Sequence, residues 1–122
     1  MATLLLIEDD LMVRATLRQI LERAGHVVIE ADHGGEGLSK LEQQHIDLMI
    51  TDIIMPEKEG IETIIEARRR HPQLPIMAIS GGGRTRNMDF LEVARQAGAD
   101  STMAKPLRAQ QLVDEIDQLL RA

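Results

Sequence analysis

Short apolar runs alternate along the chain with segments in which apolar residues recur every three or four positions. A continuous apolar run of this length is typical of a strand that is buried on both faces, as in parallel sheets. A spacing of three or four residues is typical of a helix with one buried face. Five runs are predicted to be strands, at residues 3–7, 27–29, 48–50, 76–79 and 102–104.

Each predicted strand is followed by a predicted helix. The first helix has clear end signals, because Asp10 is a favourable N-cap residue and Gly25 a favourable C-terminal stop. The second, which carries Leu38 and Leu41, has a weaker pattern. The other helices are indicated by Ile61, Ile64, Ile65 and Ala67, by Phe90, Leu91, Val93, Ala94 and Ala97, and by Leu107, Leu112, Val113, Ile116, Leu119 and Leu120.

This alternation predicts an α/β fold: a doubly wound, five-stranded parallel sheet with helices on both faces. Crossovers in such a sheet are right-handed, and the common strand order is 2-1-3-4-5, the flavodoxin-like arrangement. A chain of 122 residues fits one domain, so a single domain over residues 1–122 is expected. The glycines at 81–83 are predicted to form a loop, since three glycines in a row destabilise a regular element.

Composition narrows the classes of function. The chain has no cysteine, which excludes disulfides, zinc–thiolate sites and thiol catalysis. Its net charge of −6 argues against a broad nucleic-acid-binding surface. No apolar run approaches the ~20 residues that span a bilayer, and the N-terminus lacks a signal-peptide pattern. We therefore expect a cytoplasmic protein that binds neither membrane nor nucleic acid by itself.

Polar residues follow the predicted strands at the edge where ligands bind in such sheets. Glu8 and Asp9 follow the first strand, Asp52 the third, Ser80 the fourth and Lys105 the fifth. Three crowded carboxylates repel one another, and Mg²⁺ is a cation suited to such oxygen ligands. The ammonium group of Lys105 and the hydroxyl group of Ser80 would then face phosphate oxygens. These five residues together predict phosphoryl transfer to a carboxylate.

The same residues resemble the response-regulator receiver domains of two-component signalling, including the chemotaxis type. The resemblance covers the whole chain and rests on four motifs: Glu8-Asp9-Asp10 after an apolar strand, the Asp-Ile-Ile-Met-Pro segment at 52–56 with Gly60, Ser80, and Lys105-Pro106. Asp10 by itself is interpreted as a helix cap only.

The resemblance implies that Asp52 accepts a phosphoryl group from a histidine kinase or a histidine phosphotransfer protein. The protein would then signal to a downstream protein through its helix 4–strand 5–helix 5 face, or pass the phosphate on. It would be no enzyme beyond its own phosphorylation. A cis Lys105–Pro106 peptide is also implied. The site residues implied are Glu8, Asp9, Asp52 and the backbone carbonyl of Ile54 for Mg²⁺, and Ser80 and Lys105 for the phosphoryl group.

Two positions depart from the family's pattern. Thr102 stands three residues before Lys105, where the family usually has Tyr or Phe, and Leu107 replaces a frequent Phe. The aromatic side chain whose rotation reports phosphorylation is therefore missing, which affects the switch mechanism but not the chemistry at Asp52. The glycine run with Arg84 and Arg86 is a candidate source of mobility in its place.

The sequence is compatible with three hypotheses about the kind of protein. The leading one is a single-domain receiver, which the Met1 start and a helix running to the last residues favour. The second is a receiver domain excised from a longer transcription regulator. The third is a Mg²⁺-dependent phosphatase of the haloacid-dehalogenase kind, which Ile54 disfavours because that class has an acid at this position. A dinucleotide-binding fold lacks its G-x-G-x-x-G signature after the first strand.

Overall fold

The computed structural model describes the backbone of residues 1–53, 59–80 and 86–121, and their side chains except those of residues 59 and 86–90. The predictions made for Ile54, for the glycines at 81–83 and for the side chains of Arg84 and Arg86 lie outside these residues.

Strands and helices alternate along the chain, and the predicted fold class is confirmed. The strand β2 extends further than its apolar run, because it includes the polar Glu30. The elements are β1 (Thr3–Ile7), α1 (Leu11–Arg23), β2 (Val27–Ala31), α2 (Gly34–Gln43), β3 (Leu48–Asp52), α3 (Glu59–Arg70), β4 (Ile76–Ser80), α4 (Arg86–Ala97), β5 (Ser101–Ala104) and α5 (Ala109–Arg121).

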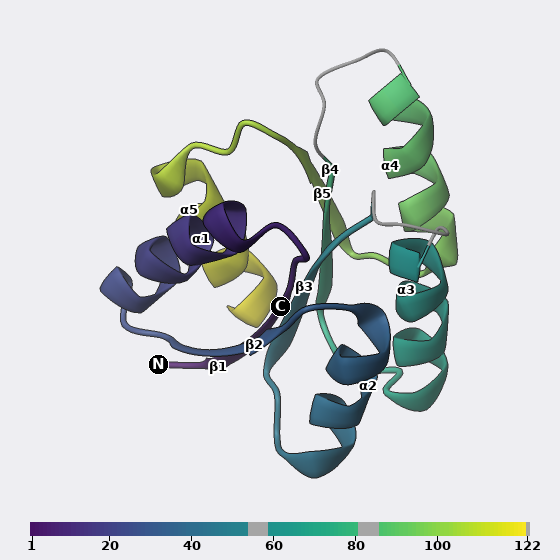
Figure 1. Ribbon diagram of the computed structural model, residues 1–122, viewed down its shortest axis with the longest axis horizontal. Coiled ribbons are helices and arrows are strands. Elements are labelled where there is room, and N and C mark those ends of the chain that lie inside the picture. Colours follow the sequence, from purple (N-terminus) through teal and green to yellow (C-terminus); the bar gives the residue numbers. More distant parts are fainter. Residues whose placement is uncertain (54–58, 81–85, 122) are drawn as a thin grey trace.

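The five strands form one parallel sheet in the order β2-β1-β3-β4-β5, as predicted. Figure 1 shows α1 and α5 on one face of this sheet and α2, α3 and α4 on the other. Strand β1 therefore lies between β2 and the central strand β3, so its carboxyl end is next to the ends of both.

Two aliphatic layers hold the helices against the sheet. Successive strand residues point to opposite faces, so Leu4 and Leu6 face α1 and α5 while Leu5 and Ile7 face the other helices. All four side chains are fully buried. Each such burial stabilises the fold by about 1.5–3 kcal/mol. Their main helical partners are Leu17, Leu21, Leu112 and Ile116 on one face and Leu41, Ile64, Ala67, Leu91 and Ala94 on the other.

Side chains cap the first two helices. The Asp10 carboxylate accepts the backbone N–H groups of Met12 and Val13, at 2.9 and 3.1 Å, which confirms its predicted role as a cap. Gly25 ends α1 with φ 96°, a conformation that glycine adopts without strain. The Nδ1 atom of His33 caps α2, a role that its sequence did not reveal.

Two acidic side chains accept hydrogen bonds from backbone N–H groups at the amino ends of the strands. The Thr3 N–H donates to Asp47 Oδ2 at 2.8 Å, and the Ile76 N–H donates to Asp100 Oδ2 at 2.9 Å. Asp100 Oδ2 also accepts from the Arg68 guanidinium at 2.6 Å. The Thr3 hydrogen bond holds the pKa of Asp47 below its usual range.

None of the helices in the described ranges combines the length and the apolar character that a bilayer crossing requires.

Candidate functional site

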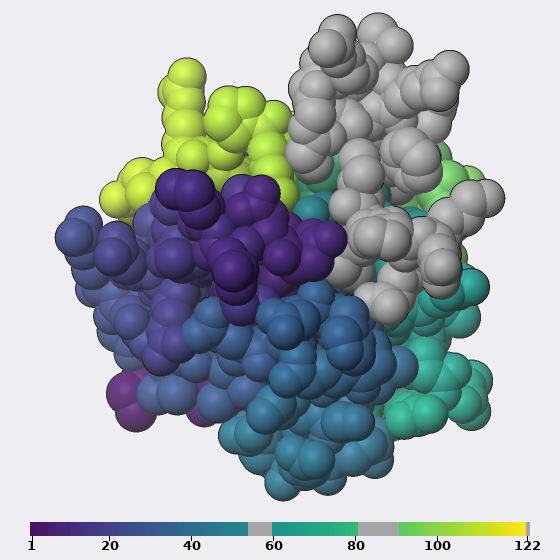
Figure 2. Space-filling view, in the orientation of Figure 1, coloured from purple at the N-terminus to yellow at the C-terminus, as the bar shows by residue number. Residues whose placement is uncertain are grey.

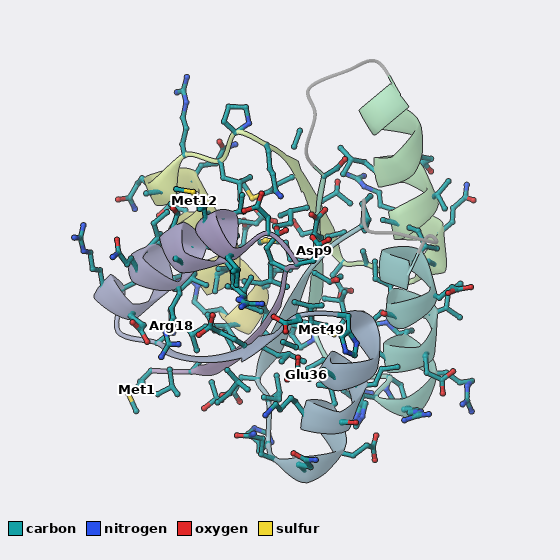
Figure 3. The ribbon with its side chains drawn as sticks, viewed as in Figure 1. Met1, Asp9, Met12, Arg18, Glu36 and Met49 are labelled. Carbon is teal, nitrogen blue, oxygen red and sulfur yellow. The ribbon has the colours of Figure 1, made fainter. Side chains whose placement is uncertain are left out.

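Three carboxylates meet at the carboxyl ends of β1 and β3. These strands are parallel neighbours with Ile7 opposite Thr51, so the residues that follow them come together. One carboxylate oxygen from each of Glu8, Asp9 and Asp52 lies within 4.8 Å of the others. Glu8 is fully buried and Asp52 is 4% exposed, whereas Asp9 faces solvent. Figure 3 shows Asp9 at this edge of the sheet, as the strand order requires.

Lys105 lies between two of these carboxylates. Its Nζ atom donates to Glu8 Oε1 at 2.9 Å and to Asp52 Oδ2 at 3.3 Å. Lys105 directly follows β5, and the cis peptide that it forms with Pro106 agrees with the one implied by the resemblance. Lys105 was predicted to lie at the same edge of the sheet as the acids, and the structure places it there, although Glu8 is 97 positions away.

Burial and neighbouring charges shift the pKa values of Glu8 and Lys105. Burial raises the pKa of Glu8 to about 7, and the charge of Asp52 acts in the same direction. Burial acts to lower the pKa of Lys105, but the hydrogen bond to Glu8 and the charge of Asp52 outweigh it and raise that pKa above its ordinary value. Among the described residues, the Lys105 ammonium group pairs with Glu8 and Asp52 but not with Asp9, so the cluster of three carboxylates keeps an excess of acidic groups over cations.

This donor set fits a hard divalent cation. The ligand atoms are all oxygens, they are close enough to share one ion, and the solvent-facing Asp9 leaves space for water molecules. Mg²⁺ prefers oxygen ligands and keeps several waters when it binds to proteins. The fourth predicted ligand, the backbone carbonyl of Ile54, lies outside the described residues.

Ser80 ends β4, the strand next to β3. It is fully buried, and its backbone carbonyl accepts the Lys105 N–H at 2.7 Å. The end of β4 therefore fixes where the Lys105 side chain begins. This places the predicted serine and lysine on the same side of Asp52, with Asp52 paired in register with Ile79.

Gly60 permits close contact between α3 and the backbone of Asp52. A Cβ atom at this position would lie 2.5 Å from the Asp52 carbonyl oxygen and 2.5 Å from the Cα of Ile53. Only glycine fits so short a distance to fixed backbone atoms. The first turn of α3 is thus packed directly against the candidate phosphoacceptor.

One contributor to the site was missed by the sequence analysis. The Arg14 Nη1 atom donates to the backbone carbonyl of Glu8 at 3.0 Å. An arginine on the polar side of a helix is usually solvated, so its position in the sequence carries no sign of this contact.

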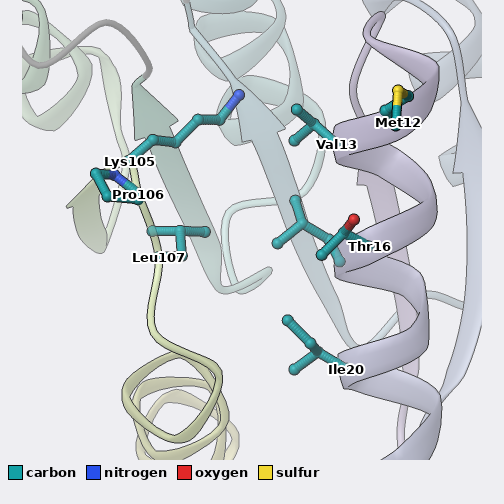
Figure 4. A pocket seen from close by; sticks show the side chains of 8 residues that line it. Met12, Val13, Thr16, Ile20, Lys105, Pro106 and Leu107 are labelled. Carbon is teal, nitrogen blue, oxygen red and sulfur yellow. The ribbon is translucent and has the colours of Figure 1, made fainter.

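An apolar groove of about 640 Å³ lies beside the site. Figure 4 shows Val13, Thr16 and Ile20 of α1 on one side of it, facing Leu107 and Pro106 on the other. Figure 2 shows the start of α1 at the surface, next to the residues that follow β5. A partner that reaches Asp52 from this edge can bury apolar side chains in the groove.

Known proteins share both the sequence and the fold. A model of the response regulator receiver domain family matches residues 4–117. The response regulator receiver protein CpdR of Brucella abortus is 35% identical, over 100% of this chain and 99% of CpdR. The transcriptional regulatory protein AfsQ1 of Streptomyces coelicolor is 37% identical, over 99% of this chain but only 52% of AfsQ1. The chain thus spans nearly all of one relative and about half of the other.

Solved structures of receiver domains have the same fold as this chain. A CheY-like response regulator receiver domain protein from Methanospirillum hungatei superimposes with a TM-score of 0.87 and 30% identity, covering 99% of this chain and 94% of that one. A response regulator receiver domain protein from Clostridium thermocellum gives a TM-score of 0.90 and 28% identity, covering 99% and 95%. The flavodoxin-like topology predicted from the sequence is that of these proteins.

Proposed function

The chain belongs to the response regulator receiver domain family of two-component signalling, and we propose that Asp52 is the residue on which it accepts a phosphoryl group. One observation carries this proposal: Asp52 is held at the end of β3 with two carboxylates within 4.8 Å and the Lys105 ammonium at 3.3 Å. A buried carboxylate in this setting has both the charge to act as a nucleophile and a cation beside it.

In the proposed reaction, an oxygen of Asp52 attacks the phosphorus of a phosphohistidine on the donor protein. The new O–P bond forms as the P–N bond breaks, and the imidazole leaves with the electron pair of that bond. Lys105, whose ammonium group lies 3.3 Å from Asp52 Oδ2, would stabilise the negative charge on the phosphoryl oxygens. The hydroxyl group of Ser80, which ends the neighbouring strand β4, would donate a hydrogen bond to one of them. Positioning and charge neutralisation account for most of the catalysis in such transfers.

Receiver domains bind Mg²⁺ at an acidic pocket, and in this chain we assign it to Glu8, Asp9, Asp52 and the backbone carbonyl of Ile54. The bound ion would offset the repulsion among the carboxylates and the charge of the incoming phosphoryl group. Glu8 contributes in a second way, because its Oε1 atom holds Lys105 while its Oε2 atom accepts the Asp10 N–H at 3.2 Å.

The donor is proposed to be a histidine kinase or a histidine phosphotransfer protein in the cytoplasm. The apolar groove supports a protein donor, because it is lined in part by Lys105, whose ammonium group contacts Asp52. Receiver domains are signalling modules rather than enzymes in the ordinary sense, and a direct nucleic-acid interaction is not proposed.

The output is proposed to leave through the α4–β5–α5 face or by onward transfer of the phosphate. Both helices are tied to β5 by polar side chains. The Arg95 guanidinium of α4 donates to Thr102 Oγ1 at 3.2 Å, and the Ser101 hydroxyl donates to Glu115 of α5 at 2.7 Å. Thr102, which replaces the usual aromatic residue, is thus part of this connection.

A second candidate is a receiver domain within a longer transcription regulator. It is favoured by AfsQ1, of which the chain covers about half, whereas CpdR, covered almost completely, favours a single-domain protein. The mass of the native protein, measured by immunoblotting of the source cells, distinguishes the two.

The proposal is tested by incubating the protein with Mg²⁺ and acetyl phosphate and measuring its mass. The parent is expected to gain one acid-stable, base-labile phosphoryl group, and Asp52→Asn to gain none. Asp47→Asn, which changes an acid at the opposite end of the sheet, is the matched control and should be labelled like the parent. Label that persists on Asp52→Asn would exclude Asp52 as the acceptor.

A further inference from the structure

Side chains hold both of the peptide groups that flank Asp9. On one side, Arg14 Nη1 donates to the carbonyl oxygen of Glu8 at 3.0 Å. On the other side, the Asp10 N–H donates to Glu8 Oε2 at 3.2 Å. Peptide groups are planar, so fixing one atom of each restricts the rotation of both planes. The orientation of the backbone on either side of Asp9 is therefore fixed. This in turn fixes the direction of the Asp9 side chain, although that side chain is exposed.

Arg14 is in turn held by the end of the neighbouring strand. Its Nε atom lies 2.9 Å from Glu30 Oε1, and its Nη1 atom also pairs with the carboxylate of Asp32. The side chain is only 12% exposed. The Glu8 N–H donates to the Ala31 carbonyl at 3.1 Å, so the ends of β1 and β2 are joined both directly and through Arg14.

We propose that Arg14 is a positioning residue for the metal site: its guanidinium holds the peptide between Glu8 and Asp9 so that the Asp9 carboxylate faces Asp52 and a shared divalent cation. The inference rests on the proposed function, in which Asp9 and Asp52 bind Mg²⁺ together. It adds a residue that touches neither the cation nor the phosphoryl group, and it explains why a cationic side chain lies next to a cation site.

Charge and position predict opposite effects of removing Arg14. A nearby positive charge repels a divalent cation, so if charge alone mattered, loss of the guanidinium would strengthen metal binding. If Arg14 acts by position, its loss frees the peptide before Asp9 and weakens metal binding. The sign of the change therefore separates the two explanations.

Arg18 is a matched control on the same helix. It lies one turn further along α1, and Figure 3 shows it well away from Asp9. Its Nε atom donates to Glu22 Oε2 at 2.8 Å, and its Nη1 atom pairs with Glu30, one of the two acids that hold Arg14. Substitution of Arg18 thus removes the same charge and one of the same partners without touching the carbonyl of Glu8.

The test uses Mn²⁺ as a probe and measures the free ion by electron paramagnetic resonance as the full chain is added. Arg14→Lys and Arg14→Gln are both expected to raise the Kd for Mn²⁺ about tenfold, the usual size of effects from residues that orient metal ligands. Arg18→Lys and Arg18→Gln are expected to stay within about twofold of the parent. Arg14→Lys keeps the charge, so it still tests the inference if Arg14→Gln does not fold.

Two results would overturn the inference alone: an Arg14 variant that binds Mn²⁺ as tightly as the parent, or Arg18 variants that lose as much affinity as Arg14 variants. A parent that binds no Mn²⁺, or an Asp9→Ala variant with undiminished affinity, would overturn the proposed metal site and this inference with it. Urea unfolding of each metal-free variant identifies any loss of affinity that follows from a loss of stability.

Discussion

The two ends of the sheet use the same residue type in opposite ways. At the amino ends, Asp47 and Asp100 each accept a strand N–H, and each acid has a partner of its own. At the carboxyl ends, Glu8, Asp9 and Asp52 lie close to one another, and Glu8 and Asp52 share the Lys105 ammonium group. The first arrangement satisfies the backbone, and the second concentrates negative charge.

The pKa values move in opposite directions at the two ends. The Thr3 N–H lowers the pKa of Asp47, so ionised Asp47 stabilises the fold. Burial raises the pKa of Glu8 to about 7, so ionised Glu8 destabilises it. An acid whose ionised form opposes folding needs another reason to be there, and the cation binding and phosphoryl transfer proposed above would supply one. The environment of each acid, and not its residue type, therefore decides whether its ionised form stabilises the fold.

The largest effect on stability is expected when the ammonium group of Lys105 is removed. Lys105→Met leaves Glu8 and Asp52 buried without their ammonium partner, and it should lower the free energy of unfolding by about 2–3 kcal/mol at pH 8 without metal. The loss should be smaller at pH 6, where Glu8 takes up a proton. Urea unfolding measures both values.

Lys40→Met, on the C-terminal half of α2, is the control and should change stability by less than about 0.5 kcal/mol. If Lys105→Met costs no more than this control, the ammonium group does not offset the carboxylates and the contrast between the two ends is lost.

The next effect is a pH dependence of stability that is caused by Glu8, at the carboxyl ends of the strands. Folded Glu8 keeps its proton up to a pKa of about 7, whereas the unfolded chain releases it near the ordinary value of 4.5. The folded state therefore binds more protons between these values, so the stability of the chelator-treated protein should fall by about 2–3 kcal/mol as the pH rises through this window. Glu8→Gln should flatten the profile.

Asp47→Asn should leave that decline in place. The lowered pKa of Asp47 means that its contribution is present above the unfolded pKa and is lost only as the pH falls below about 4. A parent profile that is flat between pH 4.5 and 7 would show that Glu8 does not resist ionisation.

A smaller loss is expected at the amino end. Asp47→Ala leaves the Thr3 N–H without its acceptor, and it should lower the free energy of unfolding by about 1 kcal/mol at pH 7. Asp47→Asn keeps an oxygen acceptor and should lose less. Chemical denaturation of the three proteins measures the difference, and equal stability of Asp47→Ala and the parent would remove the structural role assigned to this acid.

The fold and the acidic cluster could be predicted because both follow from topology. Apolar runs mark buried strands, and once the strands are parallel in the order 2-1-3-4-5, the residues after β1 and β3 must meet. The same reasoning predicts that Lys105 lies at this edge of the sheet, although it is 97 positions from Glu8 in the chain.

The contacts that fix the cluster could not be predicted. Arg14 and Arg18 occupy equivalent positions one turn apart, and only the approach of α1 to the end of β1 decides which of them reaches the carbonyl of Glu8. The same holds for Asp47, whose partner Thr3 lies 44 positions away. His33 lies in a polar stretch and histidine is not among the preferred capping residues, so the sequence does not indicate that His33 caps α2.

The most direct test of the contrast is the response of Asp9→Ala and Asp47→Ala to Mg²⁺ in urea unfolding. Mg²⁺ at ten times its Kd should stabilise the parent by about 1.4 kcal/mol, and Asp47→Ala by the same amount from a lower starting value. Asp9→Ala should start at or above the stability of the metal-free parent, because carboxylate repulsion is relieved, and should not respond. A full Mg²⁺ response in Asp9→Ala, or a lost response in Asp47→Ala, would contradict the division of structural and functional acids between the two ends of the sheet.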